Sequence, residues 1–86
     1  MIILLDRCNT TDEGPKKNIQ CQFPFMLKGI DGRWRTYEGC TSDGDEDGRY
    51  WCPTEKYFGI GDDRANNSNW GYCNTDCRHH DGGTSF

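Results

Sequence analysis

The sequence lacks the long apolar segments of a membrane protein and has little apolar material of any kind. Hydrophobic residues make up 33% of its 86 residues, and the mean hydropathy is -0.98. Its apolar start, Ile2 to Leu5, is far too short for a signal peptide or a membrane span. A chain this short buries only about 60% of the surface that its unfolded form exposes. We therefore expect a covalent or metal constraint to support a small core.

Positive charge is also scarce. The formal net charge is -4 and the sequence pI is about 4.9. A negative surface opposes nonspecific binding to nucleic acid, heparin or an anionic membrane. The sequence therefore predicts no nucleic-acid partner and no membrane span.

Groups suited to catalysis are few. Both histidines, His79 and His80, follow the last cysteine, so no arrangement of Ser, His and Asp lies within the body of the chain. No glycine-rich phosphate loop follows a predicted strand. Acid pairs exist, but surface carboxylates are their ordinary explanation in a chain with 14 acidic residues. The sequence therefore predicts no enzyme, no catalytic residue and no cofactor.

Cysteine, in contrast, is abundant and even in number, with six residues in a short chain. Cys73 and Cys77 are the only close pair, and no second pair completes a zinc site, so metal binding is disfavoured. Disulfides are the expected staples, although spacing alone does not decide the pairing. Two glycosylation sequons, beginning at Asn9 and Asn66, also indicate the secretory route, where disulfides persist.

Local patterns predict short antiparallel strands, long loops and almost no helix. Glycine occurs 11 times among Asn and Asp, which leaves helices little uninterrupted sequence. Asp31-Gly32 indicates a hairpin turn between two of the strands. Residues 1–7 are expected to form an edge strand or a leader, and residues 78–86 a flexible tail. The predicted strands are Ile2 to Leu5, Gln22 to Leu27, Arg33 to Tyr37, Arg49 to Cys52 and Asn69 to Cys73.

Three sequence pieces resemble the fibronectin type II domain: CQFPF from Cys21, CTSDGDEDGRYWCPT from Cys40, and WGYC ending at Cys73. With Cys8 and Cys77 added, the order of the six cysteines is similar to that of a kringle, although the segment between Cys21 and Cys40 is too short for a full one. The resemblance implies a small, disulfide-rich domain over residues 8–77. It also implies the pairs Cys8–Cys77, Cys21–Cys52 and Cys40–Cys73.

The resemblance further implies a ligand site made of aromatic side chains. In type II relatives, residues that match Trp51, Tyr57 and Trp70 line a shallow pocket for collagen side chains or a choline head group. This chain departs from the relatives at Leu27, where they carry an aromatic residue, and at Asp45, where they carry an arginine. Phe23, Phe25 and Tyr37 are instead expected in the core.

A kringle-like site is the other arrangement that the resemblance implies. In it, Asp43 and Asp45 bind a ligand ammonium, and Trp51, Trp70 and Tyr72 flank its alkyl stem. Gly71 stands at one position that is often basic in kringles. An internal lysine of a protein ligand therefore suits such a site better than a free amino acid.

The acidic segment Asp43 to Gly48 also matches the start of a calcium loop. Position twelve of that loop is Thr54 instead of the bidentate Glu that calcium needs, so an Asp and Gly turn is the alternative.

Together these patterns predict a non-catalytic, secreted or cell-surface module that binds an extracellular protein, either collagen-like or lysine-presenting. Recognition of a choline or glycan head group and a purely structural spacer in a mosaic protein are the alternatives. The candidate ligand-binding residues are Trp51, Tyr57, Trp70, Tyr72, Asp43 and Asp45, and the candidate glycosylation sites are Asn9 and Asn66.

Overall fold

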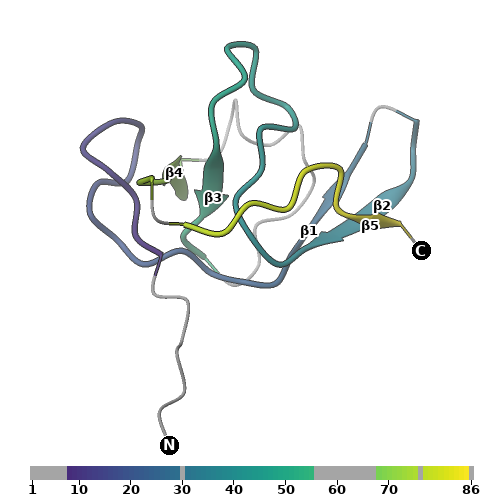
Figure 1. The fold of residues 1–86 in the computed structure, drawn as a ribbon, viewed down its shortest axis with the longest axis horizontal. Coiled ribbons are helices and arrows are strands. Elements are labelled where there is room, and N and C mark those ends of the chain that lie inside the picture. The colour runs from purple at the N-terminus through teal and green to yellow at the C-terminus, as the bar shows by residue number, and fades with distance from the viewer. Residues whose placement is uncertain (1–7, 30, 56–67, 76, 86) are drawn as a thin grey trace, which may run out of the picture.

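The computed structural model describes residues 8–29, 31–55, 68–75 and 77–85. Five short strands form in this part of the chain, and no helix does. They make two separate antiparallel sheets joined by long loops (Figure 1). The strands are β1 (Phe25–Lys28), β2 (Trp34–Tyr37), β3 (Trp51–Pro53), β4 (Trp70–Tyr72) and β5 (Thr84–Ser85).

The larger sheet has the strand order β1-β2-β5. Buried and exposed side chains alternate along β1: Phe25 and Leu27 are buried, and Met26 and Lys28 are exposed. Phe25 pairs with Tyr37 of β2, so their rings lie on the same face and stack with their centroids 5.1 Å apart. This face therefore supplies one half of the core, as the sequence predicts for Phe25 and Tyr37.

The turn between β1 and β2 lies at Asp31-Gly32, as predicted. Gly32 has a φ of 81°, a left-handed conformation that favours glycine. The Asp31 carboxylate accepts a hydrogen bond from the backbone N–H of Arg33 at 3.0 Å and pairs with the Arg35 guanidinium at 2.7 Å. Local side-chain bonds of this kind fix the loop conformation and the register of the hairpin.

The smaller sheet consists of β3 and β4, with Trp51 opposite Tyr72, Cys52 opposite Gly71 and Pro53 opposite Trp70. Residues two apart on a strand share a face, so the Trp51, Trp70 and Tyr72 side chains lie on one side. Cys52 and Gly71 lie on the other side. This sheet therefore carries an aromatic face and a disulfide face.

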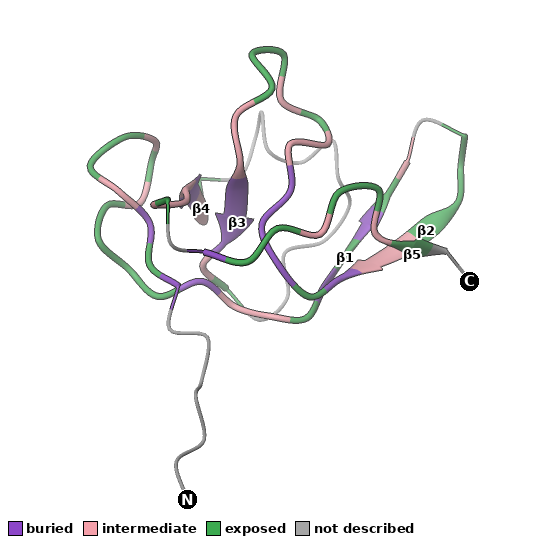
Figure 2. Ribbon diagram, viewed as in Figure 1, coloured by how far each residue is buried: buried purple, intermediate pink, exposed green. Residues whose placement is uncertain are grey.

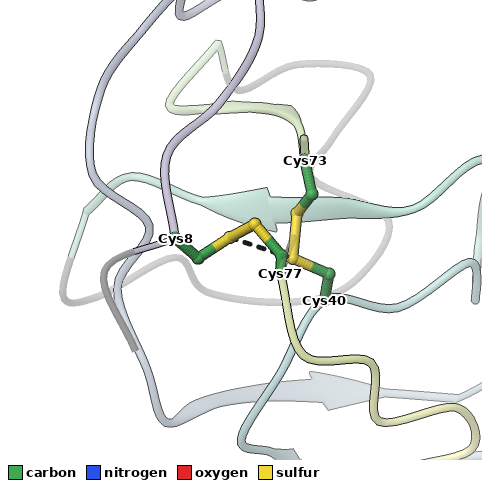
Figure 3. Close-up of side chains that lie close together, drawn as sticks. All are labelled: Cys8, Cys40, Cys73 and Cys77. Carbon is green, nitrogen blue, oxygen red and sulfur yellow. Dashed lines mark hydrogen bonds between the residues drawn. A yellow bond between two sulfur atoms is a disulfide. The ribbon is translucent and has the colours of Figure 1, made fainter. Parts of the chain in front are cut away.

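All three predicted disulfides are confirmed: Cys8–Cys77, Cys21–Cys52 and Cys40–Cys73. The bridges touch one another, since the Cys8 sulfur lies 3.3 Å from that of Cys21 and 3.4 Å from that of Cys40. Figure 3 shows the Cys8–Cys77 bridge against the Cys40–Cys73 bridge. The sulfur cluster thus forms the second half of the core.

Phe23 joins the two halves of the core, because it packs against both the sulfur cluster and the apolar cluster. Phe23 is only partly buried, whereas four members of the apolar cluster are fully buried. Strand β3, which carries one of these four, is buried along its whole length (Figure 2). Buried members of that cluster are Phe25, Leu27, Tyr37 and Trp51, with Trp70 and Tyr72 partly buried at its margin.

The segment after Cys77 differs from the predicted flexible tail over residues 78–85. Its strand β5 pairs with β2, and the Cys40 N–H donates to the Arg78 carbonyl at 2.7 Å. The His79 ring stacks on Tyr50 with a centroid distance of 3.7 Å. These partners are distant in sequence, so the polar composition of the segment gave no sign of them.

The predicted strand positions hold for β1 to β4 to within a few residues. The proposed strand at Ile2 to Leu5 lies outside the described residues. Among the residues that are described, none belongs to a helix that is long and apolar enough to cross a membrane.

We predict that Arg35→Gln raises the pKa of Asp31 in the folded protein. The Arg35 guanidinium, with the backbone N–H of Arg33, holds that pKa at about 2, below the ordinary value of about 3.9. A lowered folded-state pKa means that the pair stabilises the fold above the unfolded pKa and loses this effect as pH falls toward 2. A carboxyl 13C titration of both proteins measures the shift, and an unchanged Asp31 titration in the variant would contradict this origin.

Candidate ligand-binding surface

Trp51, expected to line a pocket, is buried with 1% of its surface exposed. Its indole N–H donates to the Asp43 carbonyl at 2.8 Å. The ring packs between Phe25 and Trp70, with centroids 5.7 and 6.1 Å away. Trp51 therefore supports the surface from beneath and offers a ligand almost no area.

Trp70 and Tyr72 are the predicted aromatic residues that reach the surface in the described chain, since both are half-buried. Their rings are nearly perpendicular, at 88°, with centroids 5.1 Å apart. Trp70 is also perpendicular to Trp51 beneath it, at 77°. Edge-to-face packing of this kind is favourable for aromatic pairs, so the two outer rings are held in fixed orientations.

Asp43 accepts hydrogen bonds from two buried residues of the core, Tyr37 and Trp51. Its carboxylate accepts a hydrogen bond from the Tyr37 hydroxyl. Burial of Tyr37, together with this bond, raises the pKa of the phenol. The same aspartate accepts the Trp51 indole N–H through its backbone carbonyl. Asp43 thus anchors two buried rings instead of forming a freely exposed anionic rim.

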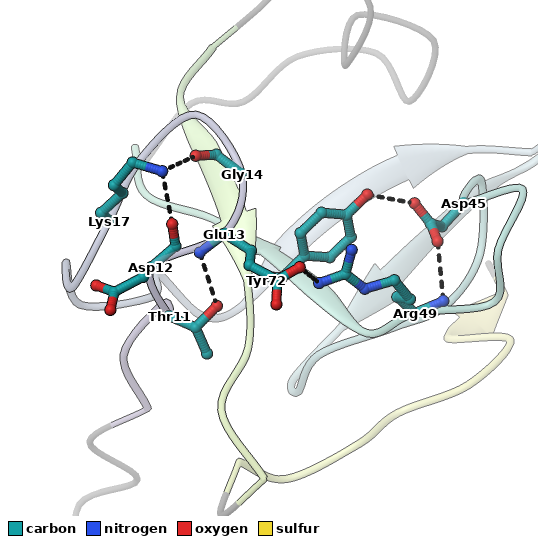
Figure 4. Close-up of polar contacts among 8 residues, drawn as sticks. All are labelled: Thr11, Asp12, Glu13, Gly14, Lys17, Asp45, Arg49 and Tyr72. Carbon is teal, nitrogen blue, oxygen red and sulfur yellow. Dashed lines mark hydrogen bonds and ion pairs between the residues drawn. The ribbon is translucent and has the colours of Figure 1, made fainter.

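Asp45 forms hydrogen bonds at the surface, with Tyr72 and with the backbone of Arg49. One carboxylate oxygen accepts the Tyr72 hydroxyl at 2.9 Å, and the other accepts the backbone N–H of Arg49 at 2.8 Å (Figure 4). The Arg49 guanidinium lies over the Tyr72 ring, 3.8 Å from its centroid, and pairs with Glu13. We call Trp70, Tyr72 and Arg49 the aromatic edge.

Gly71, between the two aromatic residues of β4, faces the opposite way against the N-terminal loop. A Cβ at this position would lie 2.6 Å from the Thr10 Cγ2 atom and closer still to the Lys16 carbonyl oxygen. The loop is tied to β4 by hydrogen bonds from Thr11 N–H to the Tyr72 carbonyl and from Lys16 N–H to the Trp70 carbonyl. No side chain fits at residue 71, so the basic residue of a kringle site has no counterpart there.

The acidic segment 43–48 forms consecutive turns. The Asp45 N–H donates to the Ser42 carbonyl and the Gly48 N–H to the Asp45 carbonyl, both at 3.1 Å. Within the described residues, the clusters with metal-ligand spacing are two groups of four cysteines, and each of those sulfurs is in a disulfide. A disulfide sulfur offers no thiolate, so these groups do not suit a metal ion.

The remaining predicted residues are divided between the surface, the core and the part of the chain outside the description. Leu27 is buried against the apolar cluster, where it cannot contribute to a ligand surface. Asn9 is exposed, while the next residue of its sequon, Thr10, is buried. Tyr57 and Asn66 lie outside the described residues.

The fibronectin type II domain model matches residues 21–73 of this chain. The matched residues make up more than half of the chain. The chain belongs to the fibronectin type II domain family. No solved structure matches it. Type II domains are small, extracellular, disulfide-rich modules of a non-catalytic family, and they often bind collagen or other ligands.

The sequence interpretation missed two residues of the aromatic edge and its surroundings in this type II domain. The sequence pattern indicates Arg49 only as the start of a strand and gives Glu13 no role. They are 36 residues apart, and only the binding of the N-terminal loop to β4 brings them together. An arginine two residues before a tryptophan-cysteine pair is a weak signal, because it becomes informative only once Tyr72 is known to lie beneath it.

We predict that Gly71→Ala destabilises this type II domain by about 1–3 kcal/mol, because the added methyl overlaps backbone that cannot move freely. Gly82→Ala is the comparison, since a Cβ there meets nothing within 4 Å and only its φ of +77° opposes the substitution. Thermal unfolding of the oxidised proteins measures the difference. Equal melting temperatures for Gly71→Ala and the wild type would show that the N-terminal loop does not pack tightly on β4.

Proposed function

We propose that this domain is a non-catalytic extracellular module that docks onto a protein ligand through the aromatic edge. The observation that carries the proposal is the arrangement of Trp70 and Tyr72, which are half-buried and fixed at 88° to each other. Rings held in place before binding lose little conformational entropy when a ligand packs on them. Aromatic and arginine side chains are also the residues that most often dominate binding energy at protein interfaces.

Membership of the type II family supports an extracellular protein ligand, and collagen-like chains are the first class to test. The charge of the aromatic edge favours this class over a ligand cation. Arg49 already lies over the Tyr72 ring, at 3.8 Å from its centroid, and a second cation beside it would be repelled. A choline head group or a lysine ammonium would need to displace the guanidinium from the ring.

The carboxylates expected to attract a lysine are also engaged. Asp43 accepts the Tyr37 hydroxyl, and Asp45 accepts the Tyr72 hydroxyl and the Arg49 N–H. A ligand ammonium would compete with these internal donors. An apolar or mixed polar segment of a protein chain needs no such displacement, so it is the ligand class we favour.

We predict that Trp70→Ala weakens binding to immobilised denatured collagen by about tenfold or more, as truncation of a central aromatic residue does at an interface. Trp34→Ala is the matched control, because Trp34 is an exposed tryptophan, 37% accessible, on β2 of the other sheet. It should change the affinity less than twofold. Trp70→Phe keeps an aromatic ring in the sheet and should retain much of the binding, which separates lost contact from lost folding.

Competition experiments test the alternatives in the same format. Displacement of the domain from denatured collagen by a lysine analogue or by phosphocholine would overturn our choice in favour of a cation site. Absence of binding to denatured collagen, with folded wild-type protein, would overturn the collagen-like class. Equal losses for Trp70→Ala and Trp34→Ala would show that the aromatic edge is not the contact surface.

The proposed glycosylation of Asn9 has its own test. The asparagine is exposed, and the hydroxyl of Thr11 completes the sequon. We predict that secretion of the domain from mammalian cells gives a glycan on Asn9 and that Asn9→Gln removes it. Peptide mapping by mass spectrometry, before and after glycosidase treatment, distinguishes Asn9 from Asn66. A secreted, fully oxidised product with unmodified Asn9 would contradict glycosylation at this site.

A further inference from the structure

Arg49 is fixed in position by three contacts from different parts of the chain. Its guanidinium lies over the Tyr72 ring, its backbone N–H donates to the Asp45 carboxylate, and one of its terminal N–H groups donates to Glu13 (Figure 4). Asp45 also accepts the Tyr72 hydroxyl. One carboxylate therefore positions both the ring and the backbone that carries the guanidinium.

The guanidinium of Arg49 still has donors available. Among residues in the described ranges, it donates a hydrogen bond only to Glu13. Its side chain is 41% exposed and that of Glu13 is 66% exposed. An arginine can donate two parallel hydrogen bonds to one carboxylate, which gives it a geometric preference for that group. Arg49 therefore has the position, the exposure and the remaining donors to receive an external carboxylate.

Glu13 is an internal carboxylate that such a ligand could replace. It lies on a turn in which its own N–H donates to the Thr11 hydroxyl at 3.2 Å, and Lys17 closes the turn by donating to the carbonyls of Asp12 and Gly14. The turn therefore keeps its shape whether or not the Glu13 side chain contacts Arg49. Ion pairs between exposed side chains contribute little stability, so exchange of Glu13 for a ligand group is energetically easy.

We propose that Arg49 is a carboxylate-binding residue of the aromatic edge, that it selects protein ligands in which an acidic side chain neighbours an apolar one, and that Glu13 occupies the site when no ligand is bound. This inference rests on the proposed protein-docking function and names the ligand chemistry that the same surface prefers. The apolar neighbour of the acid packs on Tyr72, whose ring lies under the guanidinium, and on Trp70, whose ring packs against Tyr72.

The surroundings of Arg49 favour a carboxylate over a phosphate or sulfate. Glu13 and Asp45 both contact this residue, and the whole chain has a formal net charge of -4. A ligand carboxylate that replaces Glu13 at Arg49 brings one negative charge, the same charge that the Glu13 carboxylate has there. A doubly charged phosphate adds further negative charge beside Asp45, so repulsion opposes it.

The direct test is an NMR titration of the oxidised domain with a blocked Glu-Phe dipeptide, with a blocked Gln-Phe dipeptide and with inorganic phosphate. Backbone resonances of Arg49 and Tyr72 and the indole resonance of Trp70 report binding. We expect the Glu-Phe dipeptide to bind about tenfold more tightly than Gln-Phe, as for a charge-assisted pair of hydrogen bonds, and phosphate to bind more weakly than Glu-Phe. The dissociation constant for Glu-Phe should rise with added salt.

Paired variants locate the effect. Glu13→Gln should tighten Glu-Phe binding about threefold because it removes the competing carboxylate, whereas Glu38→Gln makes the same change in net charge at another exposed position and should leave affinity unchanged. Arg49→Gln should weaken binding about tenfold, and Arg33→Gln, an exposed arginine in the β1–β2 turn, should not. Arg49→Lys keeps the charge without the planar fork and should recover only part of the affinity.

Equal binding of the two dipeptides, or an unchanged Glu-Phe dissociation constant in Glu13→Gln and Arg49→Gln, would overturn the inference. Native disulfides and unchanged Trp51 and Trp34 resonances in each variant confirm that the fold is intact. Binding to denatured collagen, measured for the same variants, distinguishes a wrong carboxylate preference from a wrong docking function. If Trp70→Ala loses collagen binding while the Glu13 and Arg49 variants keep it, only the carboxylate preference is wrong; if the wild type binds no protein ligand, the docking function itself fails.

Discussion

Contact among the three disulfides is the interaction on which the rest of the structure depends. The Cys8 sulfur touches bridges from two other parts of the chain, at 3.3 and 3.4 Å. One bridge spans 69 residues and the others span 31 and 33. In the chain-entropy model, the longest loop alone contributes about 4 kcal/mol by restricting the unfolded state. Strands of two to four residues can persist here because covalent bonds, and not sheet length, hold them in place.

A continuous series of aromatic contacts connects the apolar half of the core to the surface. It runs from Tyr37 through Phe25 to Trp51, and then through Trp70 to Tyr72. Asp43 and Asp45 fix the two ends, the first through the Tyr37 hydroxyl and the second through the Tyr72 hydroxyl. The acidic segment therefore has a positioning role: its two aspartates orient the rings on which a ligand would pack.

The sequence predicted the features that depend on local pattern and on cysteine order. Strands β1 to β4, the Asp31-Gly32 turn and all three disulfides follow from neighbouring residues or from the family resemblance. The burial of Trp51 and the internal hydrogen bonds of Asp43 and Asp45 could not be predicted from the sequence. Exposure depends on which residues cover a side chain in three dimensions. Strand β5 escaped prediction for the same reason, since its partner β2 lies about fifty residues earlier and the intervening sequence gives no register.

The Cys8–Cys77 bridge, with its Cα atoms 5.0 Å apart, determines how the domain responds to a pulling force. Tension applied through the chain on either side of these two cysteines passes across one covalent bond, so strands β1 to β4, which lie between them in sequence, are not loaded. The segment after Cys77 lies outside this protected loop, and its pairing with β2 is noncovalent. A force from the C-terminal side therefore peels β5 away first and stops at Cys77, leaving the aromatic edge intact under tension.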